Sequence, residues 1–132
     1  MPHVSQRILD QRTKKKITDT LELVLGKCNK IEINNFLFSL LSDTEKLMLA
    51  KRLAIVILLR EGIDHSSIAE TLSVTRETVS RMELASMKRS QGFELAFIKI
   101  EEDDAMKEVK KFLIGLASYS IKAAGGRVDS KF

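Results

Sequence analysis

The sequence predicts an all-α fold, a bundle of helices with no strand of credible length. Three observations lead to this prediction. Apolar residues recur at helical spacing along most of the 132-residue chain. The one proline is Pro2, so no proline interrupts a helix after the first residues. Hydrophobic residues make up 44% of the chain and aromatic residues only 5%, a composition typical of helical proteins.

The first half of the chain predicts three helices. A helix from Ser5 to Leu25, frayed at its start, is expected to end at Gly26. A short second helix is expected over Ile31 to Leu41, which carries its apolar residues on one face. Ser42 and Glu45 have the spacing of a capping box, so a third helix should begin there and end at Gly62.

The second half predicts four more helices. Asp64 and Thr75 are each placed to cap a short helix, and a tight turn must join these two. A further helix is expected around residues 93–100. The four acids at positions 101–104 mark the start of a last helix, which should end at Gly125 and Gly126 and leave a loose tail. These acids lack the spacing of a calcium loop, so a solvated helix start is favoured over a cation site.

Cysteine content and apolar runs limit the class of protein and its compartment. The lone cysteine, Cys28, excludes an intrachain disulfide and suits a reducing compartment. No signal peptide is apparent, and the longest apolar run, Leu53–Leu59, is too short to cross a bilayer. We therefore expect a cytoplasmic protein with no membrane partner.

The basic excess is confined to one end of the chain. Residues 1–30 hold seven basic and three acidic side chains (7 − 3 = +4), whereas residues 31–62, 63–90 and 91–132 are each neutral. The cluster comprises Arg7, Arg12, Lys14, Lys15 and Lys16. It is either an arm that binds phosphates or a solvated helix face. We expect three segments: a basic N-terminal helix or arm (1–30), a core (31–90) and a C-terminal helical extension (91–132).

The stretch from Ile63 to Met82 has the apolar spacing of a helix-turn-helix unit. Ala69 is small where the second helix crosses, while Leu72 and Val79 fill the wedge between the helices. Ser73 stands at the bend, where a left-handed backbone is usual and glycine is the common residue.

The polar residues of this unit are candidates for contacts with double-stranded DNA. Side chains in the first turns of a recognition helix reach base edges, and those at the start of the preceding helix are placed to hold a phosphate. Arg76 is the best candidate for a base contact, because its planar fork pairs with guanine. The candidates are His65, Ser66, Ser67, Thr75, Arg76, Glu77, Thr78, Ser80 and Arg81.

Other interpretations stay open. The segment is neutral, which also fits a helical hairpin with a solvated polar face or a module that binds another protein. A DNA-binding accessory subunit of a larger complex fits equally well. No enzyme, metal or cofactor is expected, because His3, His65 and Cys28 form no local ligand motif and no glycine-rich phosphate loop occurs.

The stretch from Leu40 to Arg81, about a third of the chain, resembles the Trp repressor family. The similarity lies in features that follow one another in the same order. A leucine and a hydroxyl cap residue precede an acidic helix start, an arginine lies inside KRLAIV, and EG ends that helix. An IAE-x-L-x-V run then leads to a recognition helix that ends in T-x-SR. The resemblance implies an all-helical, intertwined homodimer whose recognition helices enter successive major grooves. It thus predicts a sequence-specific transcriptional regulator, for instance a repressor.

The effector site of that family corresponds only in part. The resemblance implies that Arg52, Arg81 and Ser42 stand where two arginines and a hydroxyl residue line the pocket of the tryptophan-binding members. Met82 replaces the glycine that makes room for the indole ring there, so tryptophan is not expected to bind. Another small-molecule effector stays open, and surface ion pairs are the favoured role of Arg52 and Arg81.

Overall fold

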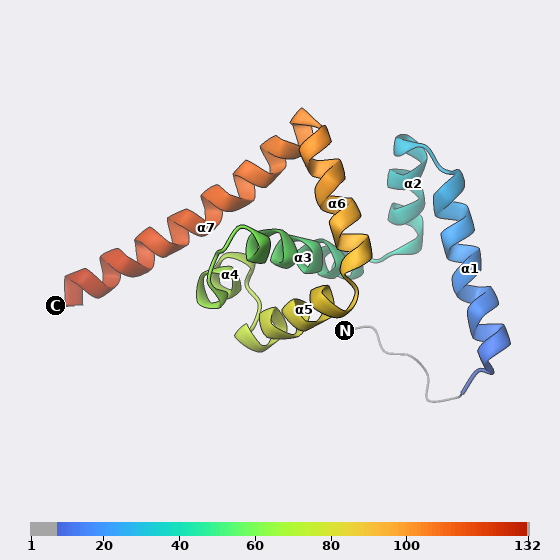
Figure 1. The fold of residues 1–132 in the computed structure, drawn as a ribbon, viewed down its shortest axis with the longest axis horizontal. Helices are drawn as coiled ribbons and strands as arrows, with labels where there is room; N and C mark the ends of the chain where they lie inside the picture. The colour runs from blue at the N-terminus through green and yellow to red at the C-terminus, as the bar shows by residue number, and fades with distance from the viewer. Residues whose placement is uncertain (1–7, 132) are drawn as a thin grey trace. The chain divides into compact units, whose positions relative to one another are not determined.

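A computed structural model describes residues 8–131, with side chains as far as Tyr119. Seven helices and no strand occur in this range, so the all-α prediction is confirmed (Figure 1). The helices are α1 (Gln11–Lys27), α2 (Lys30–Leu40), α3 (Asp43–Arg60), α4 (His65–Leu72), α5 (Arg76–Lys88), α6 (Ser90–Glu102) and α7 (Asp104–Lys131).

The chain divides into two compact units, residues 1–49 and 50–132, and the division falls within α3. In the first unit, neither α1 nor α2 has a buried residue. Each is nevertheless well capped at its start. The Asp10 side chain accepts a hydrogen bond from the Thr13 amide at 2.7 Å, and Asn29 forms a reciprocal capping box with Glu32. Local capping, rather than a core, defines these two helices.

Three of the predicted helix boundaries are wrong. The first helix begins at Gln11 rather than Ser5, passes through Gly26 and ends at Lys27, while residues 5–7 lie outside the described part. The turn is made by extended backbone at Cys28, whose amide donates to the Leu25 carbonyl, so no left-handed glycine is needed. The last helix runs to Lys131, past Gly125 and Gly126, because a helix tolerates an interior glycine at a cost of about 1 kcal/mol.

The start of α3 confirms the predicted capping box. The Glu45 amide donates to Ser42 Oγ at 3.1 Å, and the Ser42 amide donates to the Glu45 carboxylate at 2.9 Å. Near its C-terminus, α3 has five consecutive buried residues, Ala54–Leu58. A helix buried on every side lies at the centre of a core. Gly62 follows with φ of 81°, a backbone conformation that favours glycine.

The core of the second unit is one cluster drawn from five helices. The pairs α4–α5, α4–α7, α5–α6 and α6–α7 lie in contact around the C-terminal part of α3. Ile55, Leu58, Ile68 and Val79 are the largest fully buried side chains. The apolar residues that the sequence assigned to the two short helices therefore do face inward.

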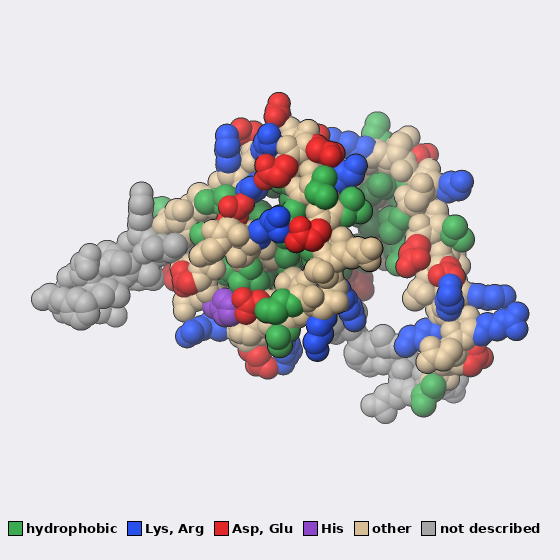
Figure 2. Space-filling model, in the orientation of Figure 1, with side chains coloured by type: hydrophobic (Ala, Val, Ile, Leu, Met, Phe, Trp, Pro, Cys, Tyr) green, Lys and Arg blue, Asp and Glu red, His purple; other side chains and the backbone are tan. Residues whose placement is uncertain are grey.

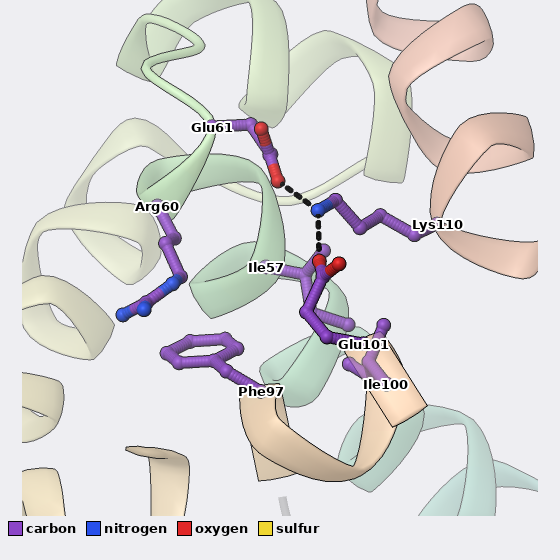
Figure 3. A pocket seen from close by; sticks show the side chains of 7 residues that line it. All are labelled: Ile57, Arg60, Glu61, Phe97, Ile100, Glu101 and Lys110. Carbon is purple, nitrogen blue, oxygen red and sulfur yellow. Dashed lines mark hydrogen bonds and ion pairs between the residues drawn. The ribbon is translucent and has the colours of Figure 1, made fainter. Parts of the chain in front are cut away.

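A charged cluster fastens α7 to the rest of this unit (Figure 3). Lys110 Nζ lies 2.6 Å from both a Glu61 and a Glu101 carboxylate oxygen. These hydrogen bonds raise the pKa of Lys110, and the bond from Lys110 lowers that of Glu101. Beside them, the Arg60 guanidinium lies 4.2 Å from the centre of the Phe97 ring. The hollow that they line has a volume of about 20 Å³, room for roughly one water molecule, so this cluster is structural.

None of the helices in the described part combines the length and the apolar character that a bilayer span requires.

Candidate nucleic-acid interface

The candidate site is built on α4, the turn after it and the first turns of α5. At the start of α4, the Asp64 side chain accepts a hydrogen bond from the Ser67 amide at 3.1 Å and from the Ser67 hydroxyl at 2.7 Å. These bonds lower the pKa of Asp64. Ser67 is buried, and its hydroxyl is occupied because it donates to Asp64, the residue that caps this helix. Ser66 is exposed beside it.

His65 points from the first turn of α4 toward α5. Its Nε2 atom lies 3.3 Å from a Glu83 carboxylate oxygen, and about a third of its side chain (34%) is exposed. The contact is an ion pair when the imidazole is protonated and a hydrogen bond when it is neutral with the proton on Nε2. His65 therefore links the two helices as well as lying at the surface.

Three features hold the turn between the helices. Ser73 has φ 53° and ψ 54°, the left-handed conformation that the sequence predicts. The next amide, that of Val74, donates to the Ala69 carbonyl at 3.0 Å, which closes the end of α4. Lys51 on α3 donates from Nζ to the Ser73 carbonyl at 3.4 Å. These bonds set the angle between α4 and α5.

The first turn of α5 is closed by two threonines. Thr75 Oγ1 accepts a hydrogen bond from the Thr78 amide at 3.0 Å, and the two hydroxyl oxygens lie 2.7 Å apart. Thr75 is thus the N-cap residue that the sequence predicts. Val79 and Met82 on the inner side of the helix are buried in the core. The burial of these two residues fixes which side of α5 faces outward.

The outer side of α5 begins with charged side chains. Arg76, Glu77 and Arg81 are exposed, and Ser80 between them is half-buried. Glu77 and Arg81 form an ion pair one helical turn apart, with 71% and 73% of their side chains exposed. No ion pair joins Arg76 to another described side chain. Of the two guanidinium groups on this side of α5, the one at Arg76 is therefore the more readily available to a ligand.

The electrostatic field of this part of the chain is balanced. Residues 63–90 carry four basic and four acidic side chains (4 − 4 = 0). Figure 2 shows basic and acidic side chains interspersed over α4, α5 and α6 on the face it presents. Such a surface attracts phosphates only weakly and would need specific contacts to bind DNA tightly.

The basic cluster of the first unit is carried by a helix. Arg12, Lys14, Lys15 and Lys16 are exposed in the first turns of α1, where Figure 2 shows the Lys and Arg side chains gathered. Lys15 pairs with Asp19 at 2.9 Å, which raises the pKa of Lys15. Positive charge at a helix N-terminus opposes the helix macrodipole, so helix stability does not explain these residues. Arg7 lies outside the described residues.

Of the residues that the resemblance places at an effector pocket, Ser42, Arg81 and Met82 have other roles in the structure, and the surface ion pair expected of Arg52 and Arg81 is found only for Arg81. Ser42 caps α3 through its hydroxyl, and Arg81 pairs with Glu77. Arg52 is exposed on α3 and forms no ion pair with any side chain that the structure describes. Met82 is 6% exposed and belongs to the core.

Two features of this region were missed by reasoning from the sequence. Lys51 contacts a turn 22 residues away, and no local pattern marks such a contact. Leu84 and Met87 continue the outer side of α5 and are 56% and 64% exposed. Leu84 lies one helical turn after Ser80 and Met87 two turns after it, and this spacing could have placed both on the polar side of the helix.

Comparison of the chain with models of protein families, with curated proteins and with solved structures finds no match.

Proposed function

We propose that this protein is a sequence-specific DNA-binding transcriptional regulator that acts as a homodimer and reads DNA with α4 and α5 as a helix-turn-helix. The observation that carries the proposal is the joint at Ser73. A left-handed residue joins two short capped helices, which bury Ile68, Ala69 and Val79 between them and leave the start of α5 in solvent. Two short helices joined in this way can present a recognition helix to a major groove, which supports the proposal.

The proposed base contacts lie on the exposed side of α5. Arg76 takes the first position, with a free guanidinium suited to the two acceptors of guanine. Glu77 and Arg81 exchange their ion pair for base or phosphate contacts, while Thr75, Thr78 and Ser80 supply hydroxyls beside them. His65 and Ser66 at the start of α4 contact the backbone, and Ser67 contributes by holding this turn in place.

Dimer formation is supported by the first unit, which lacks a core of its own. Its helices expose large apolar side chains, a feature that soluble monomers seldom retain as contiguous patches. On α1 and α2 the exposed fractions are Ile17 56%, Leu21 42%, Leu23 66%, Val24 38%, Ile31 74%, Phe38 74% and Leu40 50%. A second copy that contributes the same helices would cover them, as the resemblance of residues 40–81 to the Trp repressor family implies.

The basic start of α1 supplies the nonspecific part of DNA binding in this proposal. The α4–α5 segment is neutral, so attraction to phosphates must come from elsewhere in the chain. Four exposed basic side chains within five positions of one helix meet this need.

The test is selection of bound sequences from a random pool of duplex DNA by the full chain at two salt concentrations. We expect enrichment of a palindrome whose half-sites are about one helical turn apart, with total retention falling at the higher salt. The absence of any enriched sequence at either salt would contradict the proposal.

A helical module that binds another protein is the second candidate function. It is favoured by Leu84 and Met87, which place apolar surface on the same outer side of α5 as Arg76. The substitutions Leu84→Ser and Met87→Ser distinguish the two functions. A DNA reader would keep its selected consensus in these variants, whereas a protein-binding module enriches no DNA sequence and would lose its partner.

Tryptophan is not the proposed effector. The side chain of Met82 fills the core at the place where the resemblance would need room for an indole ring, and Ser42 is occupied in its cap. A different small molecule, whose negative charge Arg52 would neutralise, stays within the proposal. Isothermal titration with tryptophan is expected to give no heat of binding.

A further inference from the structure

Glu77 lies at the middle of the exposed side of α5, in the turn that the proposed function brings to DNA. A helix advances by about 100° per residue, so the exposed residues of α5 cover an arc of roughly 140°. They are Arg76, Glu77, Arg81, Leu84, Met87 and Lys88. Glu77 lies near the centre of that arc, opposite the buried Val79 and Met82. Of the side chains in the first turn, that of Glu77 therefore points most directly away from the core.

A carboxylate at this position limits what can lie opposite it on DNA. An ionised carboxylate only accepts hydrogen bonds, and it is repelled by phosphates. The base edges of the major groove offer two donors, the N4 amino group of cytosine and the N6 amino group of adenine, whereas guanine and thymine present acceptors. Adenine has the N7 acceptor beside its amino group, which repels the carboxylate, while cytosine presents its donor alone. Cytosine is therefore the base that suits a glutamate at position 77 best.

We propose that Glu77 makes the protein specific for cytosine at one position of each DNA half-site, by accepting a hydrogen bond from the cytosine N4 amino group. The inference rests on the proposed function, because it requires α5 to enter a major groove. It goes further in naming the base, and it makes an acidic residue, rather than Arg76 alone, decide which sequences are rejected. A base that presents an acceptor at this position leaves the carboxylate desolvated and unpaired, and this cost excludes such a base.

The ion pair with Arg81 leaves the carboxylate available for this contact. The Arg81 guanidinium binds Glu77 Oε1, and no hydrogen bond or ion pair among the described residues engages Oε2. Both side chains lie largely in solvent, so the bond between them is weak and is readily exchanged. Arg81 then becomes available to a phosphate, and its positive charge compensates the carboxylate that enters the groove beside the DNA backbone.

The neighbouring Arg76 narrows where this cytosine lies in the half-site. Adjacent Cα atoms are about 3.8 Å apart, close to the step of about 3.4 Å between base pairs. Arg76 and Glu77 should therefore reach base pairs that lie within about two steps of each other. Arginine pairs with guanine and glutamate with cytosine. The half-site is thus expected to hold a conserved guanine and a conserved cytosine close together.

The test is selection from a random pool of duplex DNA by the natural full chain, by Glu77→Gln and by Glu77→Ala, followed by affinity measurements on duplexes that differ at the selected position. The natural chain should select cytosine there and bind it about tenfold more tightly than adenine. Glu77→Gln should select adenine instead, because an amide both accepts from N6 and donates to N7. Glu77→Ala should lose the preference at this position and keep the rest of the half-site.

The control is Glu102→Gln, which removes one exposed negative charge from α6. Both glutamine variants should gain some affinity for every duplex, because each removes a charge that repels phosphates, but only Glu77→Gln should change the selected base. A half-site that keeps its cytosine in Glu77→Gln would overturn the inference and leave the proposed function standing. The absence of any selected sequence for the natural chain would instead contradict the proposed function, and the inference with it.

Discussion

Ser73 shows at the scale of one residue how the chain turns from α4 into α5. A left-handed backbone costs an L-residue about 1–2 kcal/mol, and serine adopts it here because the surrounding bonds require it. The Val74 amide must reach the Ala69 carbonyl, and Lys51 holds the Ser73 carbonyl from α3. The sequence predicted this conformation from the spacing of the flanking helices.

Replacing Ser73 with glycine should stabilise the protein. Ser73→Gly removes the backbone strain, which stabilises the folded state, but glycine also raises the entropy of the unfolded chain, which opposes folding. The net gain in the free energy of unfolding should be about 0.5–1 kcal/mol. Ser80→Gly, within α5, should instead cost about 0.5 kcal/mol. Chemical denaturation of both variants checks the opposite signs, and a loss of stability in Ser73→Gly would show that the side chain matters more than the strain.

Asp64 should make the stability of the protein depend on pH in the acid range. Its pKa in the folded protein lies below the ordinary value of 3.8, because the Ser67 hydroxyl and amide bind the ionised form. The stabilisation is thus complete above about pH 4–5 and is lost as the pH falls through the folded pKa. Asp64→Asn keeps a capping side chain, so its stability should match that of the natural protein near neutral pH and fall less in acid.

The control for this measurement is Asp104→Asn, since that carboxylate lies fully in solvent. Denaturation curves between roughly pH 2 and 7 compare the three proteins. An unchanged acid dependence in Asp64→Asn would assign the effect to other groups.

At the scale of helices, the starts that a capping residue marks were predicted correctly. Ser42, Asp64 and Thr75 each cap a helix as their sequence context indicates, because a cap is a bond between residues three positions apart. The glycines at 26 and 125 were wrongly taken as stops. A glycine permits a turn without requiring one, and whether the helix continues depends on the chain beyond it.

The attachment of α7 could not be predicted in the same way. Lys110 joins Glu61, 49 positions earlier in the chain (110 − 61), and Glu101 on α6. The sequence predicted that the four acids at positions 101–104 start the last helix, whereas Glu101 and Glu102 end α6. Only the folded arrangement shows that one lysine bridges two other elements.

Removing the Lys110 amino group should loosen α7. We expect Lys110→Ala to cost about 1 kcal/mol of stability, since the ion pairs are partly exposed and screened by solvent. Amide exchange should speed up in α7 while α5 keeps its protection. Lys111→Ala, whose ion pair lies within α7 at 72% exposure, is the matched control and should change stability by less than about 0.5 kcal/mol. Equal effects of the two substitutions would contradict a role for the bridge.

For the whole molecule, the sequence predicted which residues form the core of the second unit. It did not predict what covers the apolar faces of the first unit. Periodicity identifies which residues are apolar on one face, as for Leu21 on α1 and Leu40 on α2. It does not say which surface covers them. In the proposed homodimer a second chain covers them, and that proposal rests on the exposure of these faces.

The basic start of α1 should affect all DNA sequences alike. If they bind phosphates as proposed, replacing Lys14, Lys15 and Lys16 with alanine should lower affinity on every duplex and reduce the slope of log K against log salt by about 2–3. Binding to a selected and to a random duplex at several salt concentrations measures both effects. A loss confined to the selected duplex would instead make these lysines readers of sequence.

The most direct test of DNA reading by α5 is a binding titration of Arg76→Ala against the selected duplex and a shuffled one. The control is Lys99→Ala, which removes one exposed positive charge on α6. We expect Arg76→Ala to lose about tenfold or more in affinity for the selected duplex, with little change on the shuffled one. An equal loss on both duplexes, or a loss matched by Lys99→Ala, would contradict it.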